Sequence, residues 1–187
     1  MGRGIETKRK IAEAFKVLMI EKSFEEIHIK DITDECNISR LSFYYHYQDK
    51  YDLLNQIFYM EVLEPVRGQI DLDTWPEMLL RSLNSMRKSR KYYIKAMSIN
   101  SEEYKKNVFD LARKVMNETV LKIAENEVVN PNDLDFISGF FAYGLSGMVH
   151  EWCMRGMNDE PSRLVSQSVN LLEDLKRFAA VRYFMEN

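Results

Sequence analysis

A short stretch near the N-terminus has a mixture of side chains that suits contact with nucleic acid. Between residues 36 and 48 there is no acidic residue, and the stretch contains Arg40, His46 and three tyrosines. Hydroxyl groups can bond phosphate oxygens, and an arginine can donate two hydrogen bonds to a guanine. The residue types and the absence of carboxylates therefore favour a local DNA-binding surface, even though the net charge of the whole chain is −3.

Ser39 is a suitable N-cap for a short helix that runs to about Tyr47. At about 100° per residue, Phe43 and Tyr47 lie on one side of this helix, where they would join the core. A broad arc on the opposite side is formed by Leu41, Ser42, Tyr44 and Tyr45. This arc suits a DNA major groove, where hydroxyls reach phosphates or base edges and a leucine can contact a thymine methyl group.

Three further residues extend this predicted surface. Arg40 at the helix start can read a guanine, while His46 and Lys50 are placed where phosphates would pass. Two alternatives stay open: Tyr44 and Tyr45 could pack on the next helix, and Lys50 could be an ordinary solvated charge.

The apolar pattern around this helix predicts the elements that position it. Apolar residues recur at helical spacing over residues 5–21, and a second, short helix is predicted over residues 29–35. Asn37 is a plausible turn residue because it tolerates left-handed backbone geometry. Two short helices joined by a tight turn describe a helix-turn-helix. Asp49 can cap a fourth helix that continues to Pro65.

The rest of the chain is also predicted to be helical, with breaks at prolines and at the Asn-Pro-Asn sequence that begins at residue 130. The expected helices cover residues 75–88, 91–99, 102–127, 133–157 and 161–184. We therefore expect an all-α protein of about nine helices. Residues 1–50 would form a DNA-binding domain, and residues 51–187 would form a helical effector-binding and dimerisation domain.

Composition agrees with this fold class and narrows the function. The 187 residues are 45% apolar and 29% charged, with only 7 glycines and 4 prolines, too few for the many turns of a sandwich or barrel. The most apolar segment, residues 136–149, is shorter than the ~20 residues of a membrane span. Since no signal peptide is evident either, we expect a soluble, cytoplasmic protein.

Residues 24–54 resemble the DNA-binding domain of the TetR family of bacterial transcriptional regulators, and the resemblance extends over about residues 8–60. The matching positions are Phe24, Ile27, Ile29, Ile32, Ile38, Ser39, Phe43, Tyr44, Tyr47, Lys50, Leu53 and Leu54. The resemblance implies a dimeric regulator, expected to be a repressor, that binds a palindromic operator and responds to a small-molecule effector. The run over residues 140–156 also resembles a small subgroup that includes regulators of dihydroxyacetone kinase operons.

Carried over residue by residue, the resemblance assigns base-edge contacts to Arg40, Leu41 and Ser42. It assigns phosphate contacts to Tyr44, Tyr45, His46 and Lys50. Two positions depart from the family pattern. His28 stands where the family usually has a Thr or Ser that caps the second helix and contacts a phosphate, so that contact is in doubt. Asn37 replaces the usual turn glycine. Asparagine can adopt the left-handed backbone conformation that this turn needs.

The C-terminal half carries two further expectations. The segment over residues 136–149 is apolar all round, and the last helix has its own apolar stripe, so two helices from each subunit could form a four-helix bundle. The expected dimer-interface residues are Phe141, Leu145, Met148, Trp152, Leu164, Leu172 and Leu175. Expected effector-binding residues are aromatics and methionines of the middle helices, although each could be simple core: Trp75, Met78, Tyr93, Met97, Phe109, Met116, Phe140 and Tyr143.

Metal and catalytic sites have little support in the sequence. His150 and Cys153 are spaced so that they could share a zinc ion, but no second pair completes such a site. There is no glycine-rich phosphate loop and no nucleophile elbow. We expect no metal, no cofactor and no enzyme activity. The alternative function is a helical adaptor that acts through protein contacts without sequence-specific DNA binding, or a regulator whose effector is a protein.

Overall fold

The computed structural model describes residues 3–71, 73–124 and 129–186, and it describes their side chains except at residues 3, 103, 123 and 175–186. Within these ranges the chain forms nine α-helices, one π-helical turn and no strand. The all-α prediction is therefore confirmed. No helix in the described part is both long and apolar enough to cross a membrane.

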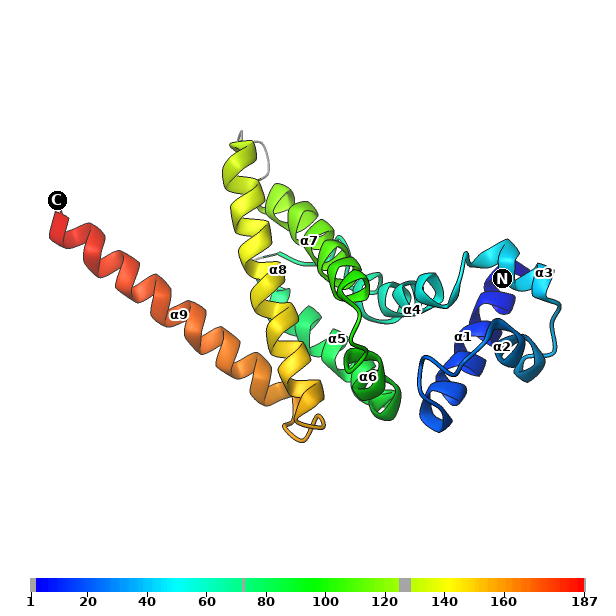
Figure 1. Cartoon of the computed structure of the whole chain (residues 1–187). Coiled ribbons are helices and arrows are strands. Elements are labelled where there is room, and N and C mark those ends of the chain that lie inside the picture. The colour runs from blue at the N-terminus through cyan, green and yellow to red at the C-terminus, as the bar shows by residue number, and fades with distance from the viewer. Residues whose placement is uncertain (1–2, 72, 125–128, 187) are drawn as a thin grey trace.

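The N-terminal head consists of three helices, which Figure 1 shows at one end of the molecule. They are α1 (Arg3–Glu21), α2 (Ile29–Glu35) and α3 (Arg40–His46). Helix α2 has the predicted bounds, and α3 ends one residue before the predicted end. Ile11, Phe15, Ile32 and Phe43 are fully buried between these helices and hold the head together.

The turn between α2 and α3 has the predicted geometry. Asn37 has a φ of 53°, in the left-handed region. The amide of Ile38 donates to the carbonyl of Thr33 at 3.0 Å and closes the turn. This turn fixes how α3 is presented by the head.

Helix α4 (Lys50–Phe58) connects the head to the body. The carboxylate of Asp49 accepts from the amides of Tyr51 and Asp52 at 2.8 Å, which is the predicted cap. The predicted helix to Pro65 is only partly correct, because the chain changes at Tyr59 into the π-helical turn η1 (Tyr59–Leu63). A wider turn of this kind is rare and is often associated with function.

The body is built from α5 (Trp75–Lys88), α6 (Arg90–Met97), α7 (Glu102–Ala124) and α8 (Pro131–Met154). Helices α7 and α8 lie side by side, tied by an ion pair between Arg113 and Asp135 and by stacked rings of Phe109 and Tyr143. The prediction that α8 runs to Met157 is wrong. The helix ends at Met154 because Gly156 and Met157 both adopt positive φ.

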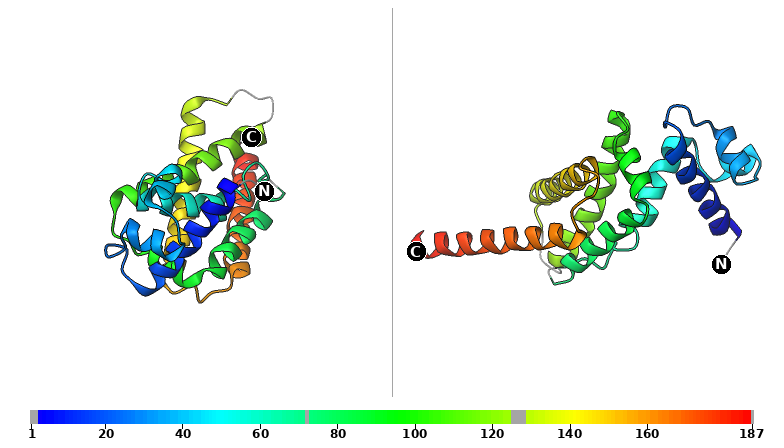
Figure 2. Two further views of the ribbon diagram at one scale, coloured as in Figure 1. Left: turned by 90° about the vertical axis from the view of Figure 1, so that its right-hand side faces the viewer. Right: turned by 90° about the horizontal axis from the view of Figure 1, so that it is seen from below.

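Helix α9 (Pro161–Glu186) leaves the body as a long arm, as Figures 1 and 2 show. Its first turns pack on α5, where Val165 is buried and Leu164 and Val169 contact the core. The later turns project away from α7 and α8. The arm therefore ends without a neighbouring helix from its own chain in these views.

The head and the body share one continuous core. The ring of Phe15 in α1 meets Tyr92 of α6 edge-on at 6.4 Å between centroids. The ammonium of Lys95 in α6 donates to the carbonyl of Ile20 at the end of α1 at 2.9 Å. Because packing crosses residue 50, the division into residues 1–50 and 51–187 stays a proposal about function.

Candidate nucleic-acid interface

Helix α3 has large side chains that point into solvent and do not pack in the core. Leu41 is 81% exposed, Tyr45 is 84% exposed and Tyr44 is 55% exposed. Arg40 is also exposed, and Ser42 is half-buried. Large apolar and aromatic groups that face water at this density mark an interaction surface. The predicted arc of α3 is thus available to a ligand.

The opposite side of α3 anchors it. Phe43 is fully buried and Tyr47 is 1% exposed, as the helical wheel requires. The hydroxyl oxygen of Ser39 accepts from the amide of Ser42 at 3.1 Å, so Ser39 is the N-cap of α3. This bond does not use the proton of the Ser39 hydroxyl, which can be donated to a phosphate or a base. Anchoring and capping together make α3 a rigid element on which contacts can be placed.

The N-terminal part of α1 adds positive charge beside α3. The Lys8 ammonium lies 6.0 Å from the centroid of the Tyr47 ring. Partial burial of His46, together with the charge of Lys8, lowers the pKa of His46 below its usual value. Arg9 and Lys10 are exposed on the same helix. Lys8, Arg9 and Lys10 therefore give the surface around the end of α3 positive charge that attracts an anion.

Lys50 has a structural role that the sequence did not indicate. Its ammonium donates to the carbonyls of Phe24, Glu25 and Ile27 at 2.7, 3.2 and 3.0 Å. It also lies 4.4 Å from the centroid of the Phe24 ring. An ammonium has three protons, and these three carbonyls use them all. The predicted phosphate contact would require Lys50 to release at least one of them.

His28 lies at the N-cap of α2, but its ring forms no capping bond. Instead, its amide donates to the carboxylate of Asp31 at 2.8 Å, and this bond lowers the pKa of Asp31. Asp31 thus takes over part of the capping that a Thr or Ser side chain would provide. The sequence contained the sign of this capping bond, because Asp31 is an acidic residue three positions after the N-cap His28. The His28 ring is exposed.

A largely apolar cavity of about 130 Å³ lies in the body. Of the predicted effector-binding residues, Trp75, Met78, Met97 and Met116 line it. The other four predicted residues do not line this cavity, because they are engaged or face outward: Tyr93 donates to Glu61, Phe109 stacks on Tyr143, and Phe140 is 65% exposed.

The predicted dimer-interface residues fall into two groups. Three serve the monomer: Trp152 is 3% exposed and donates to the carbonyl of Asp159 at 2.9 Å, Leu145 lines the cavity, and Leu164 packs on the core. Trp152 is therefore covered within the single chain, whereas Leu145 and Leu164 are half-buried, so their interface role stays a prediction. The second group keeps accessible surface: Phe141 is exposed, and Met148 and Leu172 are half-buried. The side chain of Leu175 lies outside the described residues.

Exposed aromatic residues extend the accessible face of α8 beyond the predicted set. Phe136 is 73% exposed and Tyr143 is 68% exposed, and the rings of Phe136 and Phe140 stack at 6.5 Å. The sequence showed this segment as apolar all round, so its pattern alone could not tell which residues would remain uncovered.

His150 and Cys153 do not form a shared site. His150 is exposed, whereas Cys153 is fully buried and burial raises its pKa to about 12. A thiol in that state is protonated at neutral pH and is a poor metal ligand. In the described part of the chain, no group of three or more His, Cys, Asp or Glu residues could hold a metal ion.

Comparison with known proteins gives two family matches. Residues 9–57 match bacterial regulatory proteins of the tetR family, and residues 73–174 match a transcriptional regulator C-terminal region. The HTH-type dhaKLM operon transcriptional activator DhaS of Lactococcus lactis subsp. lactis (strain IL1403) is 27% identical over 174 residues. That alignment covers 92% of this chain and 91% of the relative.

Solved structures support the same fold. A dihydroxyacetone kinase operon activator DhaS superposes with a TM-score of 0.70 at 24% identity, covering 93% of this chain and 98% of that one. A transcriptional regulator of the TerR/AcrR family from Aquifex aeolicus VF5 gives a TM-score of 0.56 at 19% identity, covering 89% and 99%. At these identities the likeness shows the arrangement of helices.

Proposed function

Since the chain belongs to the TetR family of bacterial regulatory proteins, we propose that this DNA-binding transcriptional regulator acts as a homodimer on a palindromic operator and responds to a small-molecule effector. The family and the curated relative are transcriptional regulators, not enzymes. The single observation that supports the proposed binding mode is the exposed face of α3. The proposed site of action is the cytoplasm.

In this proposal α3 enters the major groove. Arg40, Leu41 and Ser42 lie in its first turn and contact base edges, because the N-terminal residues of a recognition helix approach the bases. Tyr44, Tyr45 and His46 contact phosphates along the groove wall. Ser39 and His28 approach the backbone from the two helix starts. The Lys50 contact remains a prediction that competes with its three carbonyl bonds.

The arm α9 and the exposed face of α8 support the proposed dimer. Leu171 is 61% exposed on the arm, and Phe136 and Phe140 are exposed on α8. A second copy could cover both surfaces in a bundle of four helices. Two heads would then reach successive major grooves about 34–36 Å apart, and the operator would carry two inverted half-sites.

The direction of regulation has two candidates. The sequence led us to expect a repressor, in which operator occupancy blocks transcription. The name of the curated relative, a transcriptional activator, favours activation instead. A promoter fused to a reporter decides between them, because deletion of the regulator raises expression from a repressed promoter and lowers it from an activated one.

The test of the binding function is selection of bound DNA from a random pool at physiological salt, using the full chain. We expect enrichment of a palindrome whose half-sites are about one helical turn apart. The matched control is a variant with Leu41→Ala and Tyr45→Ala, which alters only exposed side chains of α3. Absence of enrichment, with or without cell extract, would favour the adaptor function over sequence-specific binding.

A further inference from the structure

The cavity in the body has a lining that restricts its ligand. It lies among α4, η1, α5, α6, α7 and α8, and its volume is about 130 Å³. Among the described residues that line it there is no Asp, Glu, Lys, Arg or His. Burying an ion without a partner is far more costly than burying an apolar group. A charged ligand is therefore excluded.

The few polar groups of the lining narrow the choice further. The hydroxyl of Ser82 donates to the carbonyl of Val62 at 2.9 Å and is already used. Ser146 lines the cavity from α8, and its hydroxyl makes no hydrogen bond within the described part of the chain. The Trp75 indole is the other polar group in the wall. The cavity can thus satisfy a ligand with one hydroxyl but not one with many polar atoms.

Its volume sets the size of the ligand. An apolar cavity of about 150 Å³ remains dry and accepts benzene. At about 130 Å³ this cavity accommodates a single small ring or a short branched alkyl group. Larger ligands would require side chains such as Met78, Met97 or Met116 to move, which flexible methionines can do to a limited degree.

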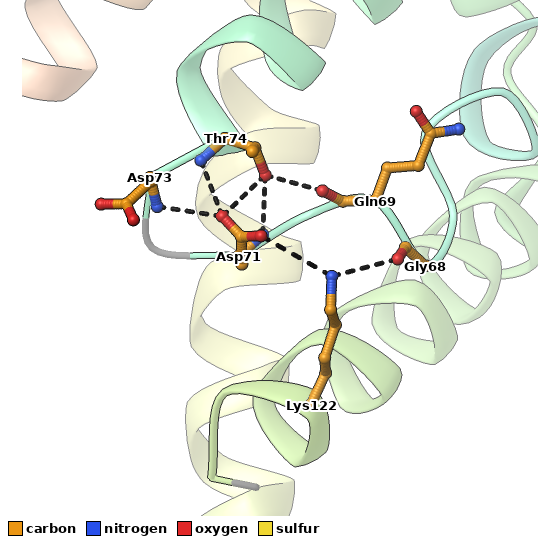
Figure 3. Close-up of polar contacts among 6 residues, drawn as sticks. All are labelled: Gly68, Gln69, Asp71, Asp73, Thr74 and Lys122. Atoms are coloured by element: carbon orange, nitrogen blue, oxygen red, sulfur yellow. Dashed lines mark hydrogen bonds and ion pairs between the residues drawn. The ribbon is translucent and has the colours of Figure 1, made fainter.

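One end of the cavity is held by a network of polar contacts, shown in Figure 3. The ammonium of Lys122 in α7 donates to the carbonyl of Gly68 at 3.1 Å and lies 3.7 Å from the carboxylate of Asp71. Asp71 in turn accepts from the amide of Thr74 at 2.8 Å. These contacts fix the segment that carries Ile70, a residue of the cavity wall. The site is thus preformed at this end.

The part of the wall formed by η1 lies next to the connection to the head. Val62 and Leu63 of η1 line the cavity, and the adjacent Glu61 accepts from Lys16 of α1 at 2.7 Å. A ligand that presses on Val62 therefore acts on the turn that holds α1. A ligand shifts the position of the head only as far as its affinities for the two positions differ.

We propose that this cavity binds one small, uncharged, mainly apolar molecule about the size of benzene, with at most one hydroxyl group directed to Ser146. The role of this molecule as the effector rests on the proposed function. The binding itself does not, so it can be tested on the full chain without DNA.

The first experiment is isothermal titration calorimetry with toluene, phenol and benzoate as probes. Toluene and phenol have the same number of heavy atoms, and phenol has a hydroxyl where toluene has a methyl group. Benzoate has a charged carboxylate on the same ring. We expect toluene and phenol to bind at one molecule per chain. Benzoate should bind about 100-fold more weakly or not at all. Equal binding of benzoate, or no binding of either neutral probe, would overturn the proposal.

Variants locate the binding. Ala112→Leu on α7 adds three carbons to the cavity wall and should abolish binding of toluene, whereas Lys106→Leu on the exposed side of the same helix should leave it unchanged. Ser146→Ala should weaken phenol about 2- to 10-fold and spare toluene. Ser166→Ala, at an exposed position of α9, is the control for Ser146→Ala. Thermal unfolding of each variant confirms that it is folded. Unchanged probe binding in both Ala112→Leu and Ser146→Ala would contradict the proposed site.

A DNA-binding measurement separates this inference from the proposed function. If the chain selects an operator while no neutral probe binds, the cavity proposal fails and the function stands. If toluene binds while no operator is selected, the function fails and the cavity proposal stands. If both are found, toluene should change operator affinity in the parent chain but not in Ala112→Leu.

Discussion

The ammonium of Lys16 lies 2.7 Å from Oε1 of Glu61, and this contact joins the first helix of the head to the π-helical turn of the body. Lys16 is only 8% exposed although it is charged. The second oxygen of Glu61 accepts from the Tyr93 hydroxyl at 2.8 Å. Burial lowers the pKa of Lys16, but its bonds to Glu13 and Glu61 outweigh this effect, so the pKa is raised overall. The raised pKa of Lys16 means that this ammonium is charged at neutral pH and loses its proton only under strongly alkaline conditions.

Lys16→Met should lower the free energy of unfolding by about 1–3 kcal/mol, because it leaves the carboxylate of Glu61 without its cation in a half-buried site. Lys10→Met is the matched control on the same helix. Its pair with Glu6 is 60% and 68% exposed, so we expect a loss below about 0.5 kcal/mol. Urea unfolding measures both. Equal losses in the two variants would show that the contact of Lys16 with Glu61 stabilises the protein no more than an exposed ion pair does.

Arg40→Ala and Tyr44→Phe should affect DNA binding in different ways. Arg40→Ala should cost about 1–3 kcal/mol on the selected operator and relax the preference at one base position. Tyr44→Phe removes one hydroxyl that is proposed to contact a phosphate, so it should weaken binding to all sequences alike. Selection with each variant reads out the preference directly. An unchanged base preference in Arg40→Ala would rule out its assignment to base reading.

Lys50→Met should destabilise the head by about 1–3 kcal/mol, because the carbonyls of Phe24, Glu25 and Ile27 lose their shared donor. Urea unfolding followed by circular dichroism measures this. Lys30→Met, at an exposed position of α2, is the control. The salt dependence of DNA binding then tests the predicted phosphate contact. A slope reduced by about one would show that Lys50 also reaches a phosphate.

DNA binding should strengthen as the pH falls from about 7.5 to about 6. Burial and Lys8 lower the pKa of His46 in the free protein, while a nearby phosphate would favour the charged ring. Binding would therefore take up a proton. The same lowered pKa means that the free protein loses stability as the pH falls below the ordinary histidine value. Fluorescence anisotropy with labelled operator measures the effect in the parent chain, in His46→Gln, in His28→Gln and in the remote control His150→Gln. His46→Gln should reduce the pH dependence, His28→Gln reports the share of the second histidine proposed to face the backbone, and His150→Gln should leave the pH dependence unchanged.

Leu171→Glu should convert the proposed dimer to monomer, because it introduces a charge at a position of α9 that is 61% exposed in the single chain. Ser166→Glu, also exposed on α9 but on a different side of the helix, is the control. Sedimentation velocity at micromolar concentration reports the mass. A Leu171→Glu variant that sediments as the parent chain does would place the interface elsewhere.

The local geometry of the head could be predicted from the sequence. Asn37 adopts the left-handed turn, Asp49 caps α4, and Leu41 and Tyr45 face outward, as the pattern predicted. Turns, caps and the two sides of a helix depend on residues within about four positions of each other. The residues that make these features are therefore readable in a short window of sequence.

The partners of long side chains could not be predicted, because they depend on the packing of distant elements. The Lys50 ammonium bonds carbonyls at the end of the α1–α2 connection, and Trp152 turns into the core to reach Asp159. The cavity is lined from α4, η1, α5, α6, α7 and α8, and the lining residues that were predicted to bind an effector are Trp75, Met78, Met97 and Met116. An amphipathic pattern shows that a residue is covered but not by which neighbour, because that choice depends on how whole helices pack. The same limit applies to the π-helical turn at Glu61, whose contact with Lys16 exists only once head and body are folded together.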